Sequence, residues 1–205
     1  MPDDRQFAPA TERNREPILE VLLQVLPPTG TVLEISSGTG EHAVFFAPRL
    51  APRRWLPSDP NPAARASIAA WRSRQPAENL EAAIAIDARD SIWTIAPDQQ
   101  KSLTAIVNIN MVHIAPMSAC VGLMRGAKRL LPAEGVLYLY GPFKQGGRPM
   151  ETSNVTFDES LRTRNSEWGI RDLEEVMAIA QLHDLSLVKT YAMPANNLSV
   201  VFRRV

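Results

Sequence analysis

The sequence predicts an α/β fold, in which helices cover both faces of a seven-stranded, mostly parallel sheet with an antiparallel C-terminal strand. Three observations support this prediction. Short apolar runs alternate with longer amphipathic segments, as in a parallel sheet with crossover helices. Residues 32–43 read as a strand, a glycine turn and a helix in succession. The last two apolar runs are separated only by Pro-Ala-Asn-Asn, so we expect them to pair antiparallel and close the sheet.

The elements follow in order along a chain that we expect to form one domain over residues 1–205, with residues 1–27 as an N-terminal helical lead-in. Pro17 stands where a first helical turn accepts proline, and the apolar residues after it share one face. The unbroken apolar character of residues 135–143 indicates a strand buried on both sides. The expected strands are residues 31–36, 53–61, 80–87, 102–113, 135–143, 185–193 and 197–205. The further expected helices are residues 41–50, 62–75 and 116–132, with two polar helices after residue 154.

Charge and cysteine content argue against several kinds of partner. The 22 basic and 22 acidic side chains leave a formal charge of +0, which offers no broad attraction for nucleic acid or an anionic membrane. Cys120 is the only cysteine, and the N-terminus lacks the apolar core of a signal peptide, so we expect a cytoplasmic protein. No apolar run is long enough to cross a bilayer. We expect a monomer or homodimer with no metal site.

The glycine turn is compatible with two cofactors. Gly38-x-Gly40-x-x-Ala43 satisfies the nicotinamide dinucleotide fingerprint, and Asp59 lies nineteen residues after Gly40, near the expected place of a ribose-binding acid. Glu34, however, stands where a dinucleotide fold keeps its strand apolar. A helix also precedes the first strand, and no second domain remains for a reducible substrate. Together these features favour S-adenosylmethionine.

The segment Glu34-x-Ser36-x-Gly38-x-Gly40 resembles motif I of class I methyltransferases, with Ser36 in place of the usual first glycine. The whole chain resembles more specifically the methyltransferase-like 26 family, a domain-of-unknown-function group. This resemblance implies the Rossmann-like class I fold and S-adenosylmethionine as cofactor, and it implies no acceptor. The residues that carry it are ERNREPIL (12–19), LEISSGTGEHAVFFA, SDPN, NMVHIAP (110–116), LYGPFK, residues 153–172 and MPANN (193–197).

The predicted cofactor-binding residues follow the first four strands. Backbone amides at the start of a helix suit the methionine carboxylate, and a nearby acid suits its ammonium. Asp59 is expected to accept hydrogen bonds from the ribose hydroxyls, although an Asx turn before Pro60 is the alternative. Asp87, or Asp90 in its place, and Ala88 are expected near the adenine, and helix capping is again the alternative. The full set is Glu34, Ser36, Gly38, Gly40, Asp59, Asn61, Asp87, Ala88 and Asn108.

Two residues at the end of the fourth predicted strand are candidate catalytic residues. Asn110 and His113 occupy the region from which the transferred methyl group faces its acceptor in this fold. Methyl transfer is a displacement at carbon, so it requires in-line placement, exclusion of water and only sometimes a base. His113 is the histidine placed to act as that base, but a structural role with its ring bonded to a carbonyl is at least as compatible with the sequence.

Polar residues on loops at strand ends, and two residues of the N-terminal segment, form the predicted acceptor site. These residues are Arg13, Asn14, Tyr140, Lys144, Asn154, Arg171, Asn196 and Asn197. The glycine-rich residues 141–154 are expected to form a lid over the cofactor site, or else a mobile surface connection. The four tryptophans share no spacing and are expected to be packing residues.

We therefore expect an S-adenosylmethionine-dependent methyltransferase that acts on a small, polar acceptor. Two alternatives remain open from the sequence. One is a nicotinamide-dependent oxidoreductase on a similar sheet, and the other is a non-catalytic protein that binds the cofactor and recruits a partner.

Overall fold

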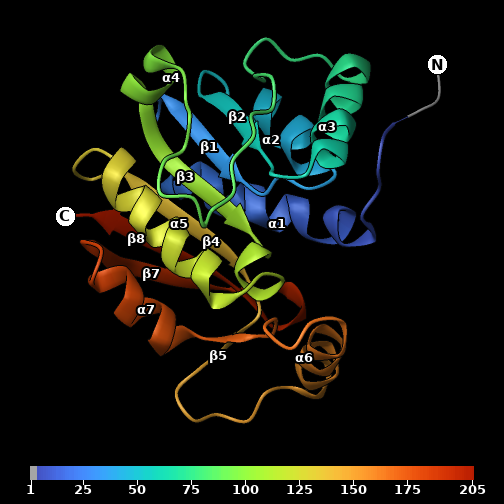
Figure 1. The fold of residues 1–205 in the computed structure, drawn as a ribbon, viewed down its shortest axis with the longest axis vertical. Helices are drawn as coiled ribbons and strands as arrows, with labels where there is room; N and C mark the ends of the chain where they lie inside the picture. Colours follow the sequence, from blue (N-terminus) through green and yellow to red (C-terminus); the bar gives the residue numbers. More distant parts are fainter. Residues whose placement is uncertain (1–3) are drawn as a thin grey trace.

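The computed structural model describes residues 4–205, and its central feature is a six-stranded sheet in the order β2-β1-β3-β4-β8-β7 (Figure 1). Within this sheet, β8 runs antiparallel to both of its neighbours, while the remaining strands share one direction. The predicted fold class, with its antiparallel C-terminal strand, is thus confirmed. Residues 1–3 of the predicted lead-in lie outside the described part. The strands are β1 (Thr31–Ile35), β2 (Arg54–Ser58), β3 (Leu103–Ile109), β4 (Val136–Gly141), β7 (Leu185–Met193) and β8 (Asn197–Arg204).

Helices cover both faces of the sheet. Residues of α1, α2 and α3 pack on one face with Val32, and residues of α5 and α7 pack on the other with Leu33 and Ile35. Because neighbouring side chains of a strand point to opposite faces, β1 needs apolar residues at successive positions to serve both layers. The helices are α1 (Pro9–Val25), α2 (Glu41–Arg49), α3 (Pro62–Arg74), α4 (Pro97–Lys101), α5 (Met117–Leu130), α6 (Thr152–Arg164) and α7 (Leu173–Gln181). None of the helices within residues 4–205 has the length and apolar character needed to span a membrane.

One of the seven predicted strands, residues 80–87, is not formed. This segment runs beside β2 but makes only two isolated parallel bridges, Trp55 to Leu80 and Ser58 to Ile84. Pro57 of β2 lies between them and has no N–H to donate, so the hydrogen-bond ladder is interrupted there. The ladder resumes when the amide of Ile84 donates to the carbonyl of Pro57 at 3.1 Å. The apolar pattern of the segment predicted a strand, but the neighbour that would have to pair with it cannot do so continuously.

The functional features gather where the parallel strands end. The 3-10 turn η1 (Met111–His113) follows β3, and β4 ends at Gly141. Gly141 pairs with Leu198, which brings the β7–β8 turn, η2 (Pro194–Asn196), to the same edge of the sheet. A small second sheet of β5 (Phe143–Lys144) and β6 (Arg171–Asp172) extends from this edge, and α6 lies beside it (Figure 1).

Candidate functional site

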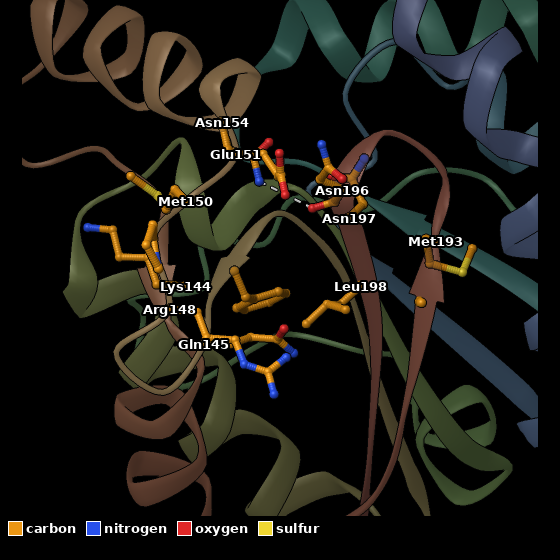
Figure 2. Close-up of a pocket in the computed structure, with 13 residues that line it drawn as sticks. Lys144, Gln145, Arg148, Met150, Glu151, Asn154, Met193, Asn196, Asn197 and Leu198 are labelled. Atoms are coloured by element: carbon orange, nitrogen blue, oxygen red, sulfur yellow. Dashed lines mark hydrogen bonds between the residues drawn. The ribbon is translucent and has the colours of Figure 1, made fainter.

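Two cavities open at this edge of the sheet. The glycine-turn cavity, of about 490 Å³, lies over the turn between β1 and α2. The loop cavity, of about 290 Å³, lies between residues 143–151, the start of α6 and the β7–β8 turn (Figure 2). Open α/β sheets bind their ligands beyond the carboxyl ends of the strands, so both cavities are candidate sites.

Five of the nine predicted cofactor residues border the glycine-turn cavity: Ser36, Gly38, Asp59, Asp87 and Ala88. They come from three separate chain segments, which follow β1, follow β2 and precede α4 in sequence. The rest of the wall includes an apolar part made by Ile109, Met111, Ile114 and Ala119, and a polar part made by Arg89, Asn165, Glu167 and Trp168.

The glycine turn is built from residues with left-handed backbone conformation. Gly38 has φ +56° and Gly40 has φ +89°. A Cβ on Gly40 would lie 2.8 Å from the backbone of Ile68, so this position also requires a glycine for packing against α3. Ser36 has φ 58° although it carries a side chain. The structure therefore shows why this position of motif I favours glycine, since a left-handed conformation strains other residues.

Asp59 ties the glycine turn to the end of β2. One carboxylate oxygen accepts the amide hydrogen of Gly38 at 3.0 Å, and the other accepts that of Asn61 at 2.9 Å. The second contact is the Asx turn that the sequence left open, and Asp59 makes it while still bordering the cavity. Asn61 itself is exposed, and its side chain caps α3 by accepting from the amide of Ala63. The structure thus gives Asn61 a capping role and places it outside the cavity wall.

Asp87 and Ala88 form the wall next to α5. Arg89 donates three side-chain hydrogen bonds to Asp87, and this pairing lowers the pKa of the Asp87 carboxyl. The carbonyl of Ala88 lies against α5 at Gly122, where a Cβ would approach the carbonyl oxygen to 2.1 Å. Gly122 therefore allows the chain to pass close to the helix and to turn into the cavity.

Glu34 lies behind the cavity rather than in its wall. The side chain is only 2% exposed, and one carboxylate oxygen accepts a hydrogen bond from the indole of Trp55 at 3.0 Å. Burial raises the pKa of Glu34 to about 7. Asn108 is also buried, and its amide donates to the carbonyl of Ile35 on β1 at 2.9 Å. Glu34, Asn108 and Gly40 therefore support the cavity wall without lining the cavity.

His113 is fully buried, at 0% exposure, and does not border the glycine-turn cavity. Its ring packs edge-on against Phe143 with 4.7 Å between centroids, and its Nδ1 accepts the amide hydrogen of Arg171 at 3.3 Å. Burial, and then the charge of Arg171, lower the pKa of His113 to about 3. This environment favours the structural interpretation over the general base, because the ring has neither access to a substrate nor a pKa near neutrality.

Asn110 adopts φ 65° and lies where β3 ends. Its amide donates to the carbonyl of Tyr140 at 2.8 Å, which joins the ends of β3 and β4. The next residue, Met111, borders the cavity, so Asn110 acts on the site by shaping this turn.

Three of the predicted acceptor residues are engaged within the protein. Asn14 is buried, its Oδ1 accepts a hydrogen bond from Nε2 of His42 at 2.8 Å, and its side chain hydrogen-bonds with Tyr140. Arg171 donates to the carbonyl oxygens of Val112, Ala115 and Glu167. These contacts fasten α1 and η1 to the sheet. Arg13 is exposed on α1 and borders neither cavity.

The other four predicted acceptor residues, Lys144, Asn154, Asn196 and Asn197, border the loop cavity (Figure 2). Gln145 and residues 148–151 also line this cavity, whereas none of residues 141–154 lines the glycine-turn cavity. The predicted lid over the cofactor site is therefore displaced: the segment beside that site is 165–168, which follows α6. Trp168 belongs to this segment and is not only a packing residue. The run Asn165-Ser-Glu-Trp after a polar helix is the sequence signal for this segment.

Solved structures of methyltransferases share this fold. An S-adenosylmethionine-dependent methyltransferase, SibL, in its apo form has a TM-score of 0.75 and 16% identity over 95% of this chain and 55% of that chain. An O-methyltransferase family 2 protein from Planctomyces limnophilus, in complex with apigenin, has a TM-score of 0.74 and 17% identity over 93% and 61%. CalO1, a methyltransferase in calicheamicin biosynthesis, has a TM-score of 0.71 and 14% identity over 93% and 54% in its S-adenosylhomocysteine-bound form. The chain thus has the class I methyltransferase fold and spans 54% to 61% of the length of these structures.

The family to which the chain belongs follows from a match of its sequence to a family model. A family model described as "Protein of unknown function (DUF938)" matches residues 5–204, and the chain belongs to this family.

Replacing Ser36 by glycine is expected to stabilise the protein. Glycine removes about 1–2 kcal/mol of left-handed strain and costs about 0.5–1 kcal/mol through the unfolded chain, so the net gain is up to about 1.5 kcal/mol. Urea unfolding of Ser36→Gly and of the wild type measures this gain in unfolding free energy. Ser37→Gly is the matched control: Ser37 accepts from the amide of Ser58 at 3.1 Å and has no positive φ, so its replacement should destabilise. Equal losses in both variants would contradict the strain at Ser36.

Glu34 is expected to make stability depend on pH. The folded protein keeps this carboxyl protonated up to about pH 7, whereas its usual pKa is 4.5, so the unfolding free energy falls as pH rises between these values. Glu34→Gln should remove this slope and be more stable than the wild type at pH 8 by on the order of 3 kcal/mol. Urea unfolding at pH 5 and pH 8 tests it, with the exposed Glu20→Gln as control. If the unfolding free energy of Glu34→Gln still falls between pH 5 and pH 8, other groups cause the pH dependence.

Proposed function

We propose that this protein transfers a methyl group from S-adenosylmethionine to a small, polar acceptor, and that the glycine-turn cavity binds the cofactor. The proposal rests on the charge of that cavity. Its wall contains the carboxylates Asp59, Asp87 and Glu167 against one cation, Arg89, which pairs with Asp87. Asp59 and Glu167 thus remain to attract a positively charged ligand, and S-adenosylmethionine carries a sulfonium and an ammonium group.

The same observation argues against a nicotinamide dinucleotide. In a dinucleotide site, amides of the glycine turn receive the pyrophosphate, and anions gather there because the helix start is positive. Here the amide of Gly38 already donates to the Asp59 carboxylate, which would also repel a pyrophosphate. The non-catalytic alternative has no observation in its favour.

The residues present fit S-adenosylmethionine along the length of the cavity. Ser36 and Gly38 would meet the methionine portion, Asp59 would accept the ribose hydroxyls, and Asp87 with Ala88 would border the adenine. Ile109, Met111 and Ala119 supply the apolar surface that a purine ring requires. When bound, the cofactor would supply an activated methyl carbon. The residues of this chain would bind and orient the cofactor and the acceptor and would exclude water, which suffices for many displacements at carbon.

The comparisons support the proposal at the level of the fold. SibL is named an S-adenosylmethionine-dependent methyltransferase, and CalO1 is described with S-adenosylhomocysteine bound. The closer resemblance to the methyltransferase-like 26 family belongs to this proposal, as do a cytoplasmic location and a monomeric or homodimeric state. His113 is not assigned as a base, because the acceptor proton has no path to its buried ring.

S-adenosylhomocysteine is expected to raise the melting temperature of the wild-type protein, because a ligand that binds only the folded state stabilises it. Asp59→Ala should lose most of this shift, measured against its own ligand-free melting temperature, since Asp59 also holds the glycine turn. Asp98→Ala is the control, because Asp98 lies on α4 outside both cavities. Scanning fluorimetry measures the melting-temperature shift with S-adenosylhomocysteine and, separately, with NADH. A shift with NADH alone would refute the proposal.

A further inference from the structure

The segment before α1, residues 5–8, lies against α3, and we call it the N-terminal arm (Figure 1). The amide of Gln6 donates to the hydroxyl oxygen of Ser67 at 2.8 Å, and the carbonyl of Gln6 accepts the indole hydrogen of Trp71 at 3.0 Å. The Phe7 ring packs edge-on against Trp71, with 5.1 Å between the ring centroids. Backbone hydrogen bonds and an aromatic contact thus join the arm to α3.

Thr39, the residue between the two glycines of the glycine turn, is held by side chains that also hold the arm. Its carbonyl accepts the hydroxyl hydrogen of Ser67 at 2.6 Å, and its own hydroxyl donates to Oε2 of Glu41 at 2.9 Å. The same Oε2 accepts the amide hydrogen of Ala8 at 2.6 Å. Ser67 and Glu41 therefore each bridge the arm to the glycine turn, and Ser67 does so at 0% exposure.

A further connection runs from α1 to the residue after Glu41. Oδ1 of Asn14 accepts a hydrogen bond from Nε2 of His42 at 2.8 Å, and the Asn14 side chain also hydrogen-bonds with Tyr140 at the end of β4. Burial, and then the charge of Arg15, lower the pKa of His42 to about 4, so its ring is neutral at physiological pH. The first two residues of α2 are thus both hydrogen-bonded to the N-terminal part of the chain.

The bridges act on the cavity through the backbone of the turn. Neither the arm nor the residues that it contacts border the glycine-turn cavity, whereas Ser36 and Gly38, which precede Thr39, do. On the other side of Thr39, Gly40 packs so closely on Ile68 that a Cβ would lie 2.8 Å from its backbone. A displacement of Thr39 would therefore move the cavity wall.

The turn also needs support from its surroundings. Ser36, Gly38 and Gly40 all have positive φ, at 58°, 56° and 89°, within a run of five residues. Sparsely populated backbone conformations persist where surrounding contacts determine them. Asp59 supplies one such contact through the amide of Gly38, and the two bridges supply the contacts to Thr39.

We infer that the N-terminal arm is a positioning element of the proposed cofactor site: its docking on Ser67 and Glu41 holds the glycine turn in the conformation that binds S-adenosylmethionine. This inference rests on the proposed function. Coupling between two equilibria is reciprocal, so binding of the cofactor strengthens the docking of the arm by the same factor by which docking strengthens binding.

Hydrogen exchange of the wild-type protein measures this reciprocity without any substitution. The amides of Gln6 and Ala8 are the arm's donors to the two bridges. Saturation with S-adenosylhomocysteine should slow their exchange about fivefold or more, the lower end of typical coupling between sites. Residues 97–101, which form α4 outside both cavities, are the control and should exchange at the same rate with and without the ligand. Unchanged exchange at Gln6 and Ala8 would overturn the inference.

Substitution of the bridging carboxylate measures the coupling in the other direction. Glu41→Ala removes the acceptor shared by Ala8 and Thr39, so the Kd for S-adenosylhomocysteine should rise about fivefold or more in isothermal titration. Glu41→Gln keeps an oxygen acceptor and should stay within about twofold of the wild type. Glu78→Ala is the control, because Glu78 is exposed and lies outside both cavities.

A substitution in the arm itself separates its effect from that of Glu41. Gln6→Pro removes the amide donor to Ser67 and leaves both contacts of Thr39 in place, so it should raise the same Kd about threefold. Circular dichroism of each ligand-free variant checks that it is folded, and if one is not, exchange in the wild type decides. Wild-type Kd values in folded Glu41→Ala and Gln6→Pro would overturn the inference, as would equal losses in Glu41→Ala and Glu41→Gln. A wild-type protein that does not bind S-adenosylhomocysteine would instead refute the proposed function.

Discussion

The carboxylate of Asp59 is the contact on which the arrangement of the site depends. It sits at the end of β2, yet it accepts amide hydrogens from the glycine turn after β1 and from the residue that caps α3. A single side chain therefore sets the relative positions of a strand end, a ligand-binding turn and a helix start. Amide donors to a carboxylate make strong hydrogen bonds, and this carboxylate also borders the glycine-turn cavity. The side chain that shapes the glycine turn is thus also one of those on which the proposed cofactor site rests.

The fold and part of the wall of the glycine-turn cavity are predictable from the sequence because both follow from position along the strands. Asp59, Asp87 and Ala88 stand after apolar runs, and parallel strands bring their ends to one edge. The direction in which a side chain points at that edge is not predictable in this way, because it depends on packing between distant segments. Tyr140 and Arg171 are polar residues at strand ends, yet one hydrogen-bonds with Asn14 on α1 and the other with carbonyls around η1. No spacing in the sequence distinguishes them from Lys144 or Asn197, which do border a cavity.

The two cavities differ in charge, and this difference organises the molecule around the proposed reaction. Carboxylates prevail around the glycine turn, and cations prevail on the loop. Between them lies the His113 ring, neutral at physiological pH because burial holds its pKa near 3. Its ring packs on Phe143 and accepts the backbone amide hydrogen of Arg171. The histidine that the sequence suggested as a base is thus a packing residue of this edge of the sheet.

The proline in β2 has an effect beyond the strand that it interrupts. Had residue 57 carried an N–H, the neighbouring segment would be free to continue along the sheet edge in regular register. The ladder resumes at Ile84, and pairing ends where β2 itself ends, at Ser58. Beyond that point the chain passes close to α5, where Gly122 leaves room for the carbonyl of Ala88. The proline thus limits the segment to isolated bridges, and the missing side chain on α5 allows the residues that follow to form one wall of the glycine-turn cavity.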